Sequence, residues 1–195
     1  MTDNILYLHL RDPQQTFDST IVIDALHKIG FIGERFEFKG TEHYKPGEEF
    51  LHLLTFLGCS PVVSLGEPGL TGDEFCHIEF TPAAEKPLFI AGDNIKVPRC
   101  RHCNHRVDDW QQLIDAWKRR GMDEWQCPHC GNTTPLHRLK WKQCAGFGRQ
   151  FIKVWGIFEG EAVPGEELMN SLRQRSNREW DYFYCRTHNS PDSTS

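Results

Sequence analysis

The sequence lacks the patterns that assign many chains to a class. No run approaches the length of about 18 apolar residues that a membrane-spanning helix needs, so we expect no membrane partner. The first residues do not have the basic-then-apolar order of a secretory signal, which favours a cytoplasmic location. The chain has no phosphate-binding glycine loop, no Gly-x-Ser-x-Gly nucleophile turn and no His-Glu-x-x-His helix, so none of these motifs indicates a reaction.

The chain does contain enough apolar and aromatic residues to fold. Of its 195 residues, 38% are hydrophobic and 12% are aromatic, which excludes wholesale disorder and predicts one large or two small domains. In a reducing compartment, its eight cysteines indicate thiols and metal ligands more than disulfides.

The net charge of −5 is spread unevenly. Residues 1–98 hold 7 Lys and Arg against 15 Asp and Glu, whereas residues 99–160 hold 11 against 6 and residues 161–195 hold 4 against 6. The basic segment coincides with a pair of cysteine motifs. Because four thiolates and one Zn²⁺ together add −2 there, charge alone is a weak argument for nucleic-acid binding.

Two Cys-x-x-Cys motifs are the strongest chemical signal. Cys100 and Cys103 form the first, Cys127 and Cys130 form the second, and 23 residues separate them. Two residues between cysteines let both sulfurs face one ion, and the proline and glycine of the second motif suit a tight turn. The four cysteines predict one structural Zn²⁺ per chain, because a complete shell leaves no open position for catalysis. Iron is the alternative, since four thiolates also bind iron.

Over residues 99–132 the two motifs resemble the knuckles of zinc ribbons and rubredoxin-like modules. The resemblance is local and implies a structural metal. It departs from those modules in one respect, because an amphipathic helix is predicted between the knuckles where a compact ribbon has a hairpin. We therefore expect a metal-clamped loop inserted at the edge of an α/β domain.

Strand and helix patterns alternate along the chain and predict an α+β fold with two ferredoxin-like sandwich halves. The expected domains are an acidic one over 1–92 and a zinc-clamped one over 93–187, followed by a flexible tail over 188–195. Strands are expected at 5–10, 31–39, 75–80, 88–91, 94–97, 136–144, 149–158 and 180–186, and helices at 18–29, from Pro46, at 107–120 and from Pro164.

A short repeat suggests that the two halves arose by duplication. The sequence Pro-Gly-Glu-Glu begins at Pro46 and again at Pro164. A proline followed by acidic residues is also a general way to begin a helix, so duplication and coincidence both stay open.

The remaining cysteines and the histidines of the motifs are expected to have structural roles or to face solvent. Cysteines without knuckle spacing are expected to be small buried apolar residues; these are Cys59, Cys76, Cys144 and Cys185. Histidines beside the knuckles could bind a second metal, but solvent-facing loop positions are favoured; these are His102, His105 and His129.

Cations and aromatic residues interleave around and after the knuckles, which is the composition of a surface for single-stranded nucleic acid. The same alternation predicts a half-buried strand with its aromatics toward the core and its lysines in water. The candidate contacts are Arg101, Arg106, Lys118, Arg119, Arg120, Lys140, Trp141, Lys142 and Arg149.

Residues for catalysis are harder to assemble. Cys76 and His77 could act as nucleophile and base, but neighbouring strand residues point to opposite faces. Carboxylates with a nearby histidine could serve acid–base chemistry, although a solvated surface is favoured; these are Glu34, Glu37, Glu42, Glu48, Glu49 and His43.

Three classes of function follow from these patterns. The leading hypothesis is a non-enzymatic binding or adaptor protein with a structural zinc and a protein partner. The alternatives are nucleic-acid binding through the basic zinc segment and an enzyme with its active site between the two halves. The identity of the partner and the oligomeric state stay open.

Overall fold

The computed structural model describes residues 2–58, 63–66 and 75–188. Its strands are β1 (Thr2–Leu10), β2 (Ile32–Phe38), β3 (Thr41–Pro46), β4 (Leu54–Phe56), β5 (His77–Phe80), β6 (Leu88–Ala91), β7 (Glu124–Gln126), β8 (Thr133–Pro135), β9 (Ala145–Gly148), β10 (Phe151–Trp155), β11 (Ala162–Pro164) and β12 (Trp180–His188). Its helices are α1 (Ser19–Lys28), α2 (Trp110–Arg120), α3 (Glu166–Ser176) and a short 3₁₀ turn, η1 (Leu136–Arg138). The chain is therefore α+β, as the sequence predicted.

A six-stranded antiparallel sheet in the order β12-β1-β10-β5-β3-β2 forms the centre of the molecule. Strand β1, between β12 and β10, is buried on both faces, because Leu6 and Leu8 point to one side and Ile5 and Tyr7 to the other. The remaining strands form three small ladders, β4 with β11, β6 with β9 and β7 with β8.

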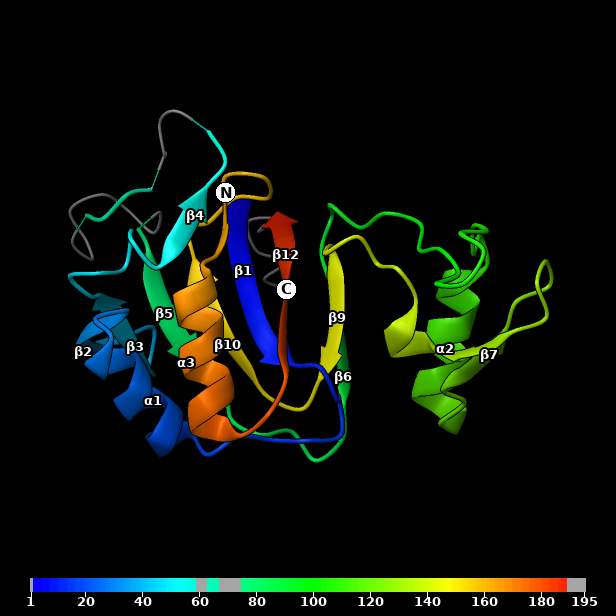
Figure 1. Cartoon of the computed structure of the whole chain (residues 1–195), viewed down its shortest axis with the longest axis horizontal. Helices are drawn as coiled ribbons and strands as arrows, with labels where there is room; N and C mark the ends of the chain where they lie inside the picture. The colour runs from blue at the N-terminus through cyan, green and yellow to red at the C-terminus, as the bar shows by residue number, and fades with distance from the viewer. Residues whose placement is uncertain (1, 59–62, 67–74, 189–195) are drawn as a thin grey trace, which may run out of the picture.

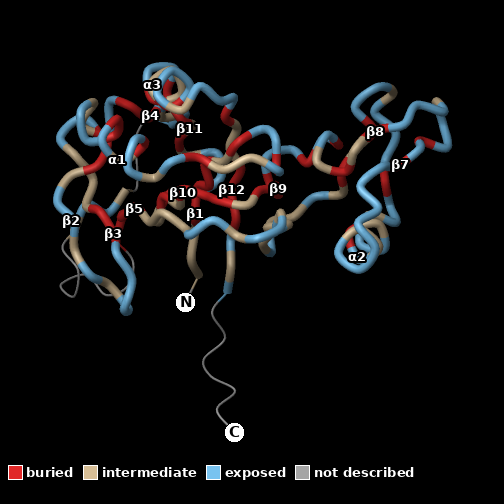
Figure 2. Tube along the Cα trace, turned by 90° about the horizontal axis from the view of Figure 1, so that it is seen from below, coloured by how far each residue is buried: buried red, intermediate tan, exposed pale blue. Residues whose placement is uncertain are grey.

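Helices α1 and α3 cover one face of this sheet and contact each other (Figures 1 and 2). Asp18 begins α1 by accepting hydrogen bonds from two backbone N–H groups of the first turn, and Val22 and Leu26 are fully buried. Leu168 and Leu172 bury the matching face of α3, so the helices and the sheet share the largest apolar core.

The opposite face of the sheet is covered in part by the β6–β9 ladder, where Ile90 packs against the apolar side chains of β1, β10 and β12. Gly146 of β9 is required at this contact. A Cβ at this position would lie 2.2 Å from the ring of Phe183, closer than any side chain tolerates.

A second lobe, residues 99–141, extends from this ladder and contains α2, β7 and β8 (Figure 1). We call it the zinc lobe. Its small apolar core is rich in tryptophan: Trp125 and Trp141 are buried, and Trp110 and Trp117 of α2 pack against them. The predicted helix at 107–120 is thus confirmed, with its first regular turn at Trp110 and its end at Gly121, which has a φ of 69°.

Two separate ferredoxin-like halves are not what the structure shows. The sheet places β1, from the beginning of the chain, between β10 and β12, from its end. Strands from before and after residue 92 therefore pair with each other and form one sheet in place of two. The segment 94–97, expected to be the first strand of the second half, has no regular structure.

The helix predicted from Pro46 is also wrong. Residues 48–53 form turns with one helical bond, from Leu53 N to Glu49 O at 3.0 Å, and Gly47 N and Glu49 N tie the segment to Phe31 O and Gly30 O. Gly47 packs so closely on Gly30 that a Cβ would lie 2.2 Å from its carbonyl oxygen. The equivalent prediction from Pro164 is confirmed by α3.

The predicted strand at 136–144 is replaced by η1 and an irregular turn. Lys142 and Gln143 have φ angles of 53° and 55°, which a strand does not permit. Strand β9 instead occupies Ala145–Gly148, where the sequence predicted a connection. Of the tail predicted at 188–195, His188 ends β12 and the rest lies outside the described residues. No helix in the described part of the chain is long and apolar enough to cross a membrane.

Candidate metal centre

The first knuckle is a tight turn closed by two backbone hydrogen bonds. Asn104 N donates to Cys100 O at 3.0 Å, and Cys100 N donates to His105 O at 2.8 Å. The turn exposes the residues between the two cysteines and directs both sulfurs inward. Asn104 has a φ of 65°, which asparagine tolerates better than most residues.

The second knuckle repeats this geometry at every equivalent position. Gly131 N donates to Cys127 O at 2.8 Å, and Cys127 N donates to Asn132 O at 2.9 Å. Gly131 has a φ of 73°, so the predicted glycine conformation is confirmed. Two segments far apart in the sequence thus adopt the same turn and point two cysteines each toward one place.

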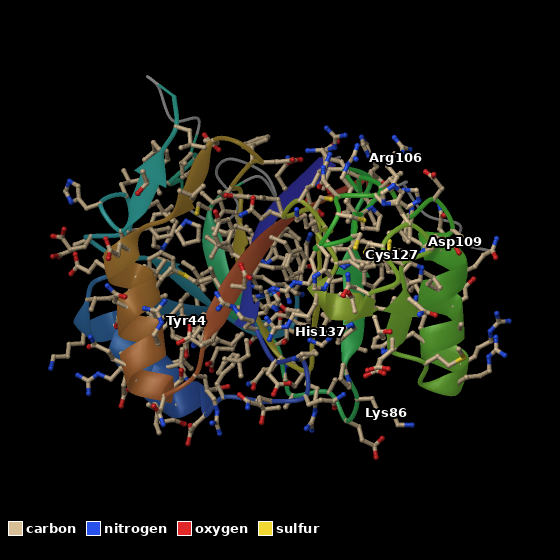
Figure 3. The ribbon with its side chains drawn as sticks, turned by 45° about the vertical axis from the view of Figure 1, so that its right-hand side comes forward. Tyr44, Lys86, Arg106, Asp109, Cys127 and His137 are labelled. Atoms are coloured by element: carbon tan, nitrogen blue, oxygen red, sulfur yellow. The ribbon has the colours of Figure 1, made fainter. Side chains whose placement is uncertain are left out.

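The four sulfur atoms lie within 4.8 Å of one another. Cys100 Sγ is 3.9 Å from Cys130 Sγ, and Cys103 Sγ is 3.6 Å from Cys127 Sγ. A tetrahedral centre with Zn–S bonds of about 2.3 Å requires sulfur separations of about 3.8 Å. The four-cysteine cluster therefore fits one zinc ion without rearrangement, and Figure 3 labels Cys127 in this lobe together with Arg106 and Asp109.

Hydrogen bonds to sulfur prepare two of the thiols for ionisation. The Asn132 side-chain amide donates to Cys130 Sγ at 3.4 Å, and with the backbone N–H of Asn132 it lowers the pKa of Cys130 to about 6. Burial opposes ionisation of Cys100, but the backbone N–H groups of Cys103 and His102 bring its pKa below the usual value. Hydrogen bonds from these N–H groups stabilise the thiolate forms, which are the forms that bind a metal.

The third thiol shows why the cluster needs a cation. The backbone N–H of His105 lowers the pKa of Cys103, but burial and the other three sulfurs outweigh it and raise that pKa to about 12. Four thiolates at these distances repel one another strongly. A divalent metal ion supplies the charge that lets all four deprotonate together.

The histidines of the knuckles lie outside the sulfur cluster. His102, His105 and His129 are exposed, as favoured from the sequence. The rings of His105 and His129 stack across the two knuckles, with centroids 5.3 Å apart and planes 10° from parallel. Among the described residues, the four cysteines are the one group that could hold a metal.

Three of the four remaining cysteines are buried, as predicted: Cys76, Cys144 and Cys185. Cys59 lies outside the described residues. Cys76 belongs to the core beneath the helices, whereas His77 stacks among aromatic rings on the other face of the sheet. The two side chains therefore do not form a nucleophile and base pair.

The predicted nucleic-acid contacts divide into exposed cations and buried or anchored groups. Trp141 is buried and donates its indole N–H to Leu136 O at 2.9 Å, so its ring is not available to stack on a base. Arg149 is held by the carbonyl oxygens of Ala84 and Gln14. The exposed cations are Arg101, Arg106, Lys118, Arg119, Arg120, Lys140 and Lys142.

Three cations form a row across the base of the first knuckle. Arg99 pairs with Arg106 on one side and with Lys140 on the other, in two antiparallel bridges. Like charges placed directly opposite each other on neighbouring strands repel. The row lies beside a cluster that has a charge of −2 when zinc is bound, and Arg106 also pairs with Asp108 at 3.0 Å.

The predicted acid–base carboxylates do not converge. Arg35 pairs with Glu42 at 2.9 Å, Lys45 with Glu34 at 3.2 Å and His52 with Glu49 at 2.9 Å, all on the surface. Glu37 and Glu48 are exposed as well. This agrees with the solvated surface favoured from the sequence.

A different carboxylate was missed. Glu79 of β5 accepts from Lys153 Nζ at 3.0 and 3.2 Å and from Trp155 Nε1 at 3.1 Å. The Glu79 and Lys153 side chains are 16% and 22% exposed, so this pair is largely buried. The sequence did carry a sign of this cluster, because Lys153 and Trp155 are two residues apart and so share one face of β10. The prediction of lysines in water and aromatics in the core had separated them.

Two neutral histidines lie next to this carboxylate. Thr41 Oγ1 donates its proton to Phe38 O at 3.0 Å, so it accepts from His43 Nε2 at 2.7 Å. The Nδ1 atom of His43 is then a buried acceptor without a partner among the described residues. Burial lowers the pKa of His43, and it lowers the pKa of His77 to about 4 although His77 Nδ1 donates to Phe75 O.

No family model, no curated protein and no solved structure matches this chain. Its fold and its metal site therefore carry the functional argument alone.

Proposed function

We propose that this chain is a non-enzymatic binding protein of the cytoplasm, in which one structural zinc holds a basic lobe in shape for an acidic protein partner. The observation that carries the proposal is the complete four-sulfur shell at tetrahedral spacing. Such a shell leaves the metal no position for a substrate. The metal then acts on structure, and the function lies in the surface that it organises.

The row of Arg106, Arg99 and Lys140 is the part of that surface closest to the metal. The −2 charge of a zinc-bound cluster offsets the repulsion within the row, so a bound metal stabilises it. Exposed cations in a row suit carboxylates on a partner, and complementary charge mainly accelerates association and selects among partners.

Nucleic acid is the second candidate, favoured by one observation. Lys118, Arg119 and Arg120 are consecutive and exposed at the end of α2. Cations at a helix end also complement the helix dipole, and the buried Trp141 leaves the lobe without this predicted stacking ring. A protein partner is therefore the better reading.

Zinc content and binding test the proposal in that order. Native mass spectrometry of the unchelated full chain should give one zinc per chain. The zinc-loaded protein should then bind a polyglutamate peptide more tightly than an oligonucleotide of equal charge. The double variant Arg106→Glu, Lys140→Glu should weaken peptide binding by at least tenfold, whereas Lys86→Glu, at the opposite end of the view from Arg106, should not (Figure 3).

Two results would overturn the proposal. Tighter binding of the oligonucleotide, with a steep dependence on salt, would transfer the function to nucleic acid. Turnover of a substrate by purified protein that retains no protein partner would make the chain an enzyme.

A further inference from the structure

A pocket of about 480 Å³ opens at the end of the sheet where β10 ends and β5 begins. Its volume is within the range of about 300–1,000 Å³ typical of sites for small molecules. Aromatic side chains line it, namely Phe75, Trp155 and Phe158, together with the charged Asp3 and Arg186. It lies in the sheet layer and shares no residue with the zinc lobe.

Trp155 is a rigid wall of this pocket. Its indole N–H donates to Glu79 Oε2 at 3.1 Å, and that carboxylate is itself held by Lys153. One side of the ring stacks on His77, with centroids 5.3 Å apart and planes 8° from parallel. The buried ion pair missed by sequence analysis therefore fixes the orientation of an aromatic ring that lines a cavity.

Phe75 extends the same stack. Its ring centroid is 4.4 Å from that of His77, so His77 is in contact with both aromatic walls of the pocket. His77 is 2% exposed and its tautomer is fixed by the bond from Nδ1 to Phe75 O. Rings fixed in this way lose little conformational entropy when a flat molecule binds against them.

The backbone keeps the pocket open. Gly156 has a φ of 80°, and its N–H donates to Asn4 O at 2.8 Å. A Cβ at this position would make an ordinary contact of 3.4 Å with Cys76 Cα, so the strain on a side chain would come from the dihedral angle. Glycine lets β10 turn away at the pocket floor.

Arg186 supplies a charge at the rim. Its side chain is exposed, and in the part of the chain that the structure describes its guanidinium makes no ion pair. Three acids lie near it: Asp93 pairs with His188 at 2.6 Å, Glu159 pairs with Lys96, and Asp3 lines the same pocket. The guanidinium can therefore offer two N–H donors to an incoming anion.

We propose that this pocket binds a planar aromatic molecule bearing a carboxylate or a phosphate, with its ring against Trp155 and Phe75 and its anionic group at Arg186. The ring gains area and stacking from two fixed aromatic walls. The anion gains a charge-assisted, bidentate hydrogen bond. This is independent of the basic surface of the zinc lobe.

The test uses zinc-loaded full-length protein and four probes in isothermal titration calorimetry. AMP carries an aromatic ring with a phosphate and 2-naphthoate carries one with a carboxylate; adenosine lacks the anion and ribose 5-phosphate lacks the ring. We expect AMP or 2-naphthoate to bind at least tenfold more tightly than adenosine, and ribose 5-phosphate not to bind at 1 mM. The tighter binder of the two aromatic anions shows whether the pocket prefers a phosphate or a carboxylate.

Variants locate the site. Arg186→Gln should weaken binding of the aromatic anion by about tenfold and leave adenosine unchanged, while Lys86→Gln should change neither. Trp155→Phe, which keeps a ring but loses the bond to Glu79, should weaken both AMP and adenosine. An unchanged melting temperature and zinc content would show that each variant is folded. Failure of both aromatic anions to bind at 1 mM, or equal binding by Arg186→Gln, would overturn the proposal.

Discussion

The sheet layer and the zinc lobe are stabilised in different ways. The core between the sheet and its two helices collects fully buried side chains from the whole chain, from Leu6 in β1 to Leu172 in α3. The zinc lobe has a much smaller core, and two of its fully buried members are Cys100 and Cys127 of the four-cysteine cluster. Apolar burial is sufficient for the first region, whereas the second is too short to fold on burial alone.

The two regions should therefore differ in how well they tolerate the loss of a single side chain. In the sheet layer one side chain is a small part of a large apolar total, so the loss of one should lower the stability without removing the fold. In the zinc lobe we expect a metal bound by the four sulfurs to supply most of the stability. Four predictions sharpen or break this comparison.

Metal removal has the largest expected effect. Chelation, or Cys127→Ser, should unfold the zinc lobe and leave the sheet folded, because structural zinc contributes on the order of 10 kcal/mol in small zinc domains. Hydrogen exchange read by mass spectrometry should lose protection in α2 and β7 and keep it in β1 and β10.

The matched control is Cys144→Ser, since Cys144 is buried outside the cluster and donates to Trp141 O at 2.7 Å, a bond that serine can make. Loss of protection across the whole chain after chelation would show that both regions unfold as one unit, and the comparison would fail.

A cavity in the sheet core should destabilise the sheet layer and leave zinc binding unchanged. Leu26 of α1 is fully buried, so Leu26→Ala should lower the free energy of unfolding by about 2–5 kcal/mol through lost contacts and an unfilled cavity. Chemical denaturation measures the loss, and zinc content should stay at one per chain. Ile21→Ala is the control, because Ile21 is 48% exposed on the same helix. An equal loss from both variants would contradict the assignment of the core.

Acid should weaken the sheet layer through His77. Burial lowers the pKa of His77 to about 4, so the folded state binds fewer protons than the unfolded state, whose histidine titrates near 6.5. The stability is complete above about pH 6.5 and falls as the pH drops toward 4, by up to about 3 kcal/mol.

His77→Phe keeps the stack on Phe75 and Trp155 but removes the titrating group. The melting temperature of this variant should therefore depend less on pH over this interval than that of the wild type. Parallel pH profiles for the two proteins would assign the acid sensitivity to other groups.

The smallest effect concerns the turns of the knuckles. Gly131→Ala forces a side chain onto a residue with a φ of 73° and should destabilise the lobe by about 1–2 kcal/mol. Asn104→Gly, at the equivalent position of the first knuckle, should be close to neutral because glycine accepts the φ of 65°. Zinc affinity, measured by competition with a chelator, should be lower for Gly131→Ala than for Asn104→Gly. Equal affinities would mean that the turns tolerate strain.

The four-cysteine cluster could be predicted from the sequence because it depends on local spacing. The ligands of each knuckle are three positions apart, so one turn places both sulfurs, and the glycine after the second pair indicated the conformation of that turn. Helices α1, α2 and α3 were also predictable, since each buries residues at helical spacing.

The sheet order could not be predicted, because it depends on pairings between residues far apart. Tyr7 lies opposite Phe183 and Lys153, and Lys153 lies opposite Glu79. No local pattern specifies these partners, and so the Glu79–Lys153 pair stayed hidden although both residues are visible in the sequence. Strand β9 was missed because its two glycines indicate a turn, and only the ring of Phe183 shows why Gly146 is needed.

The β6–β9 ladder has a consequence for the order of folding. It pairs Ala91 with Ala145, and the entire zinc lobe lies between these residues. Closing so long a loop in a disordered chain is slow, because entropy opposes it before any contact forms. Once the lobe has captured its zinc, its two ends leave from one compact body and the ladder closes over a short effective distance. Zinc present during refolding should therefore raise the rate at which the sheet is completed.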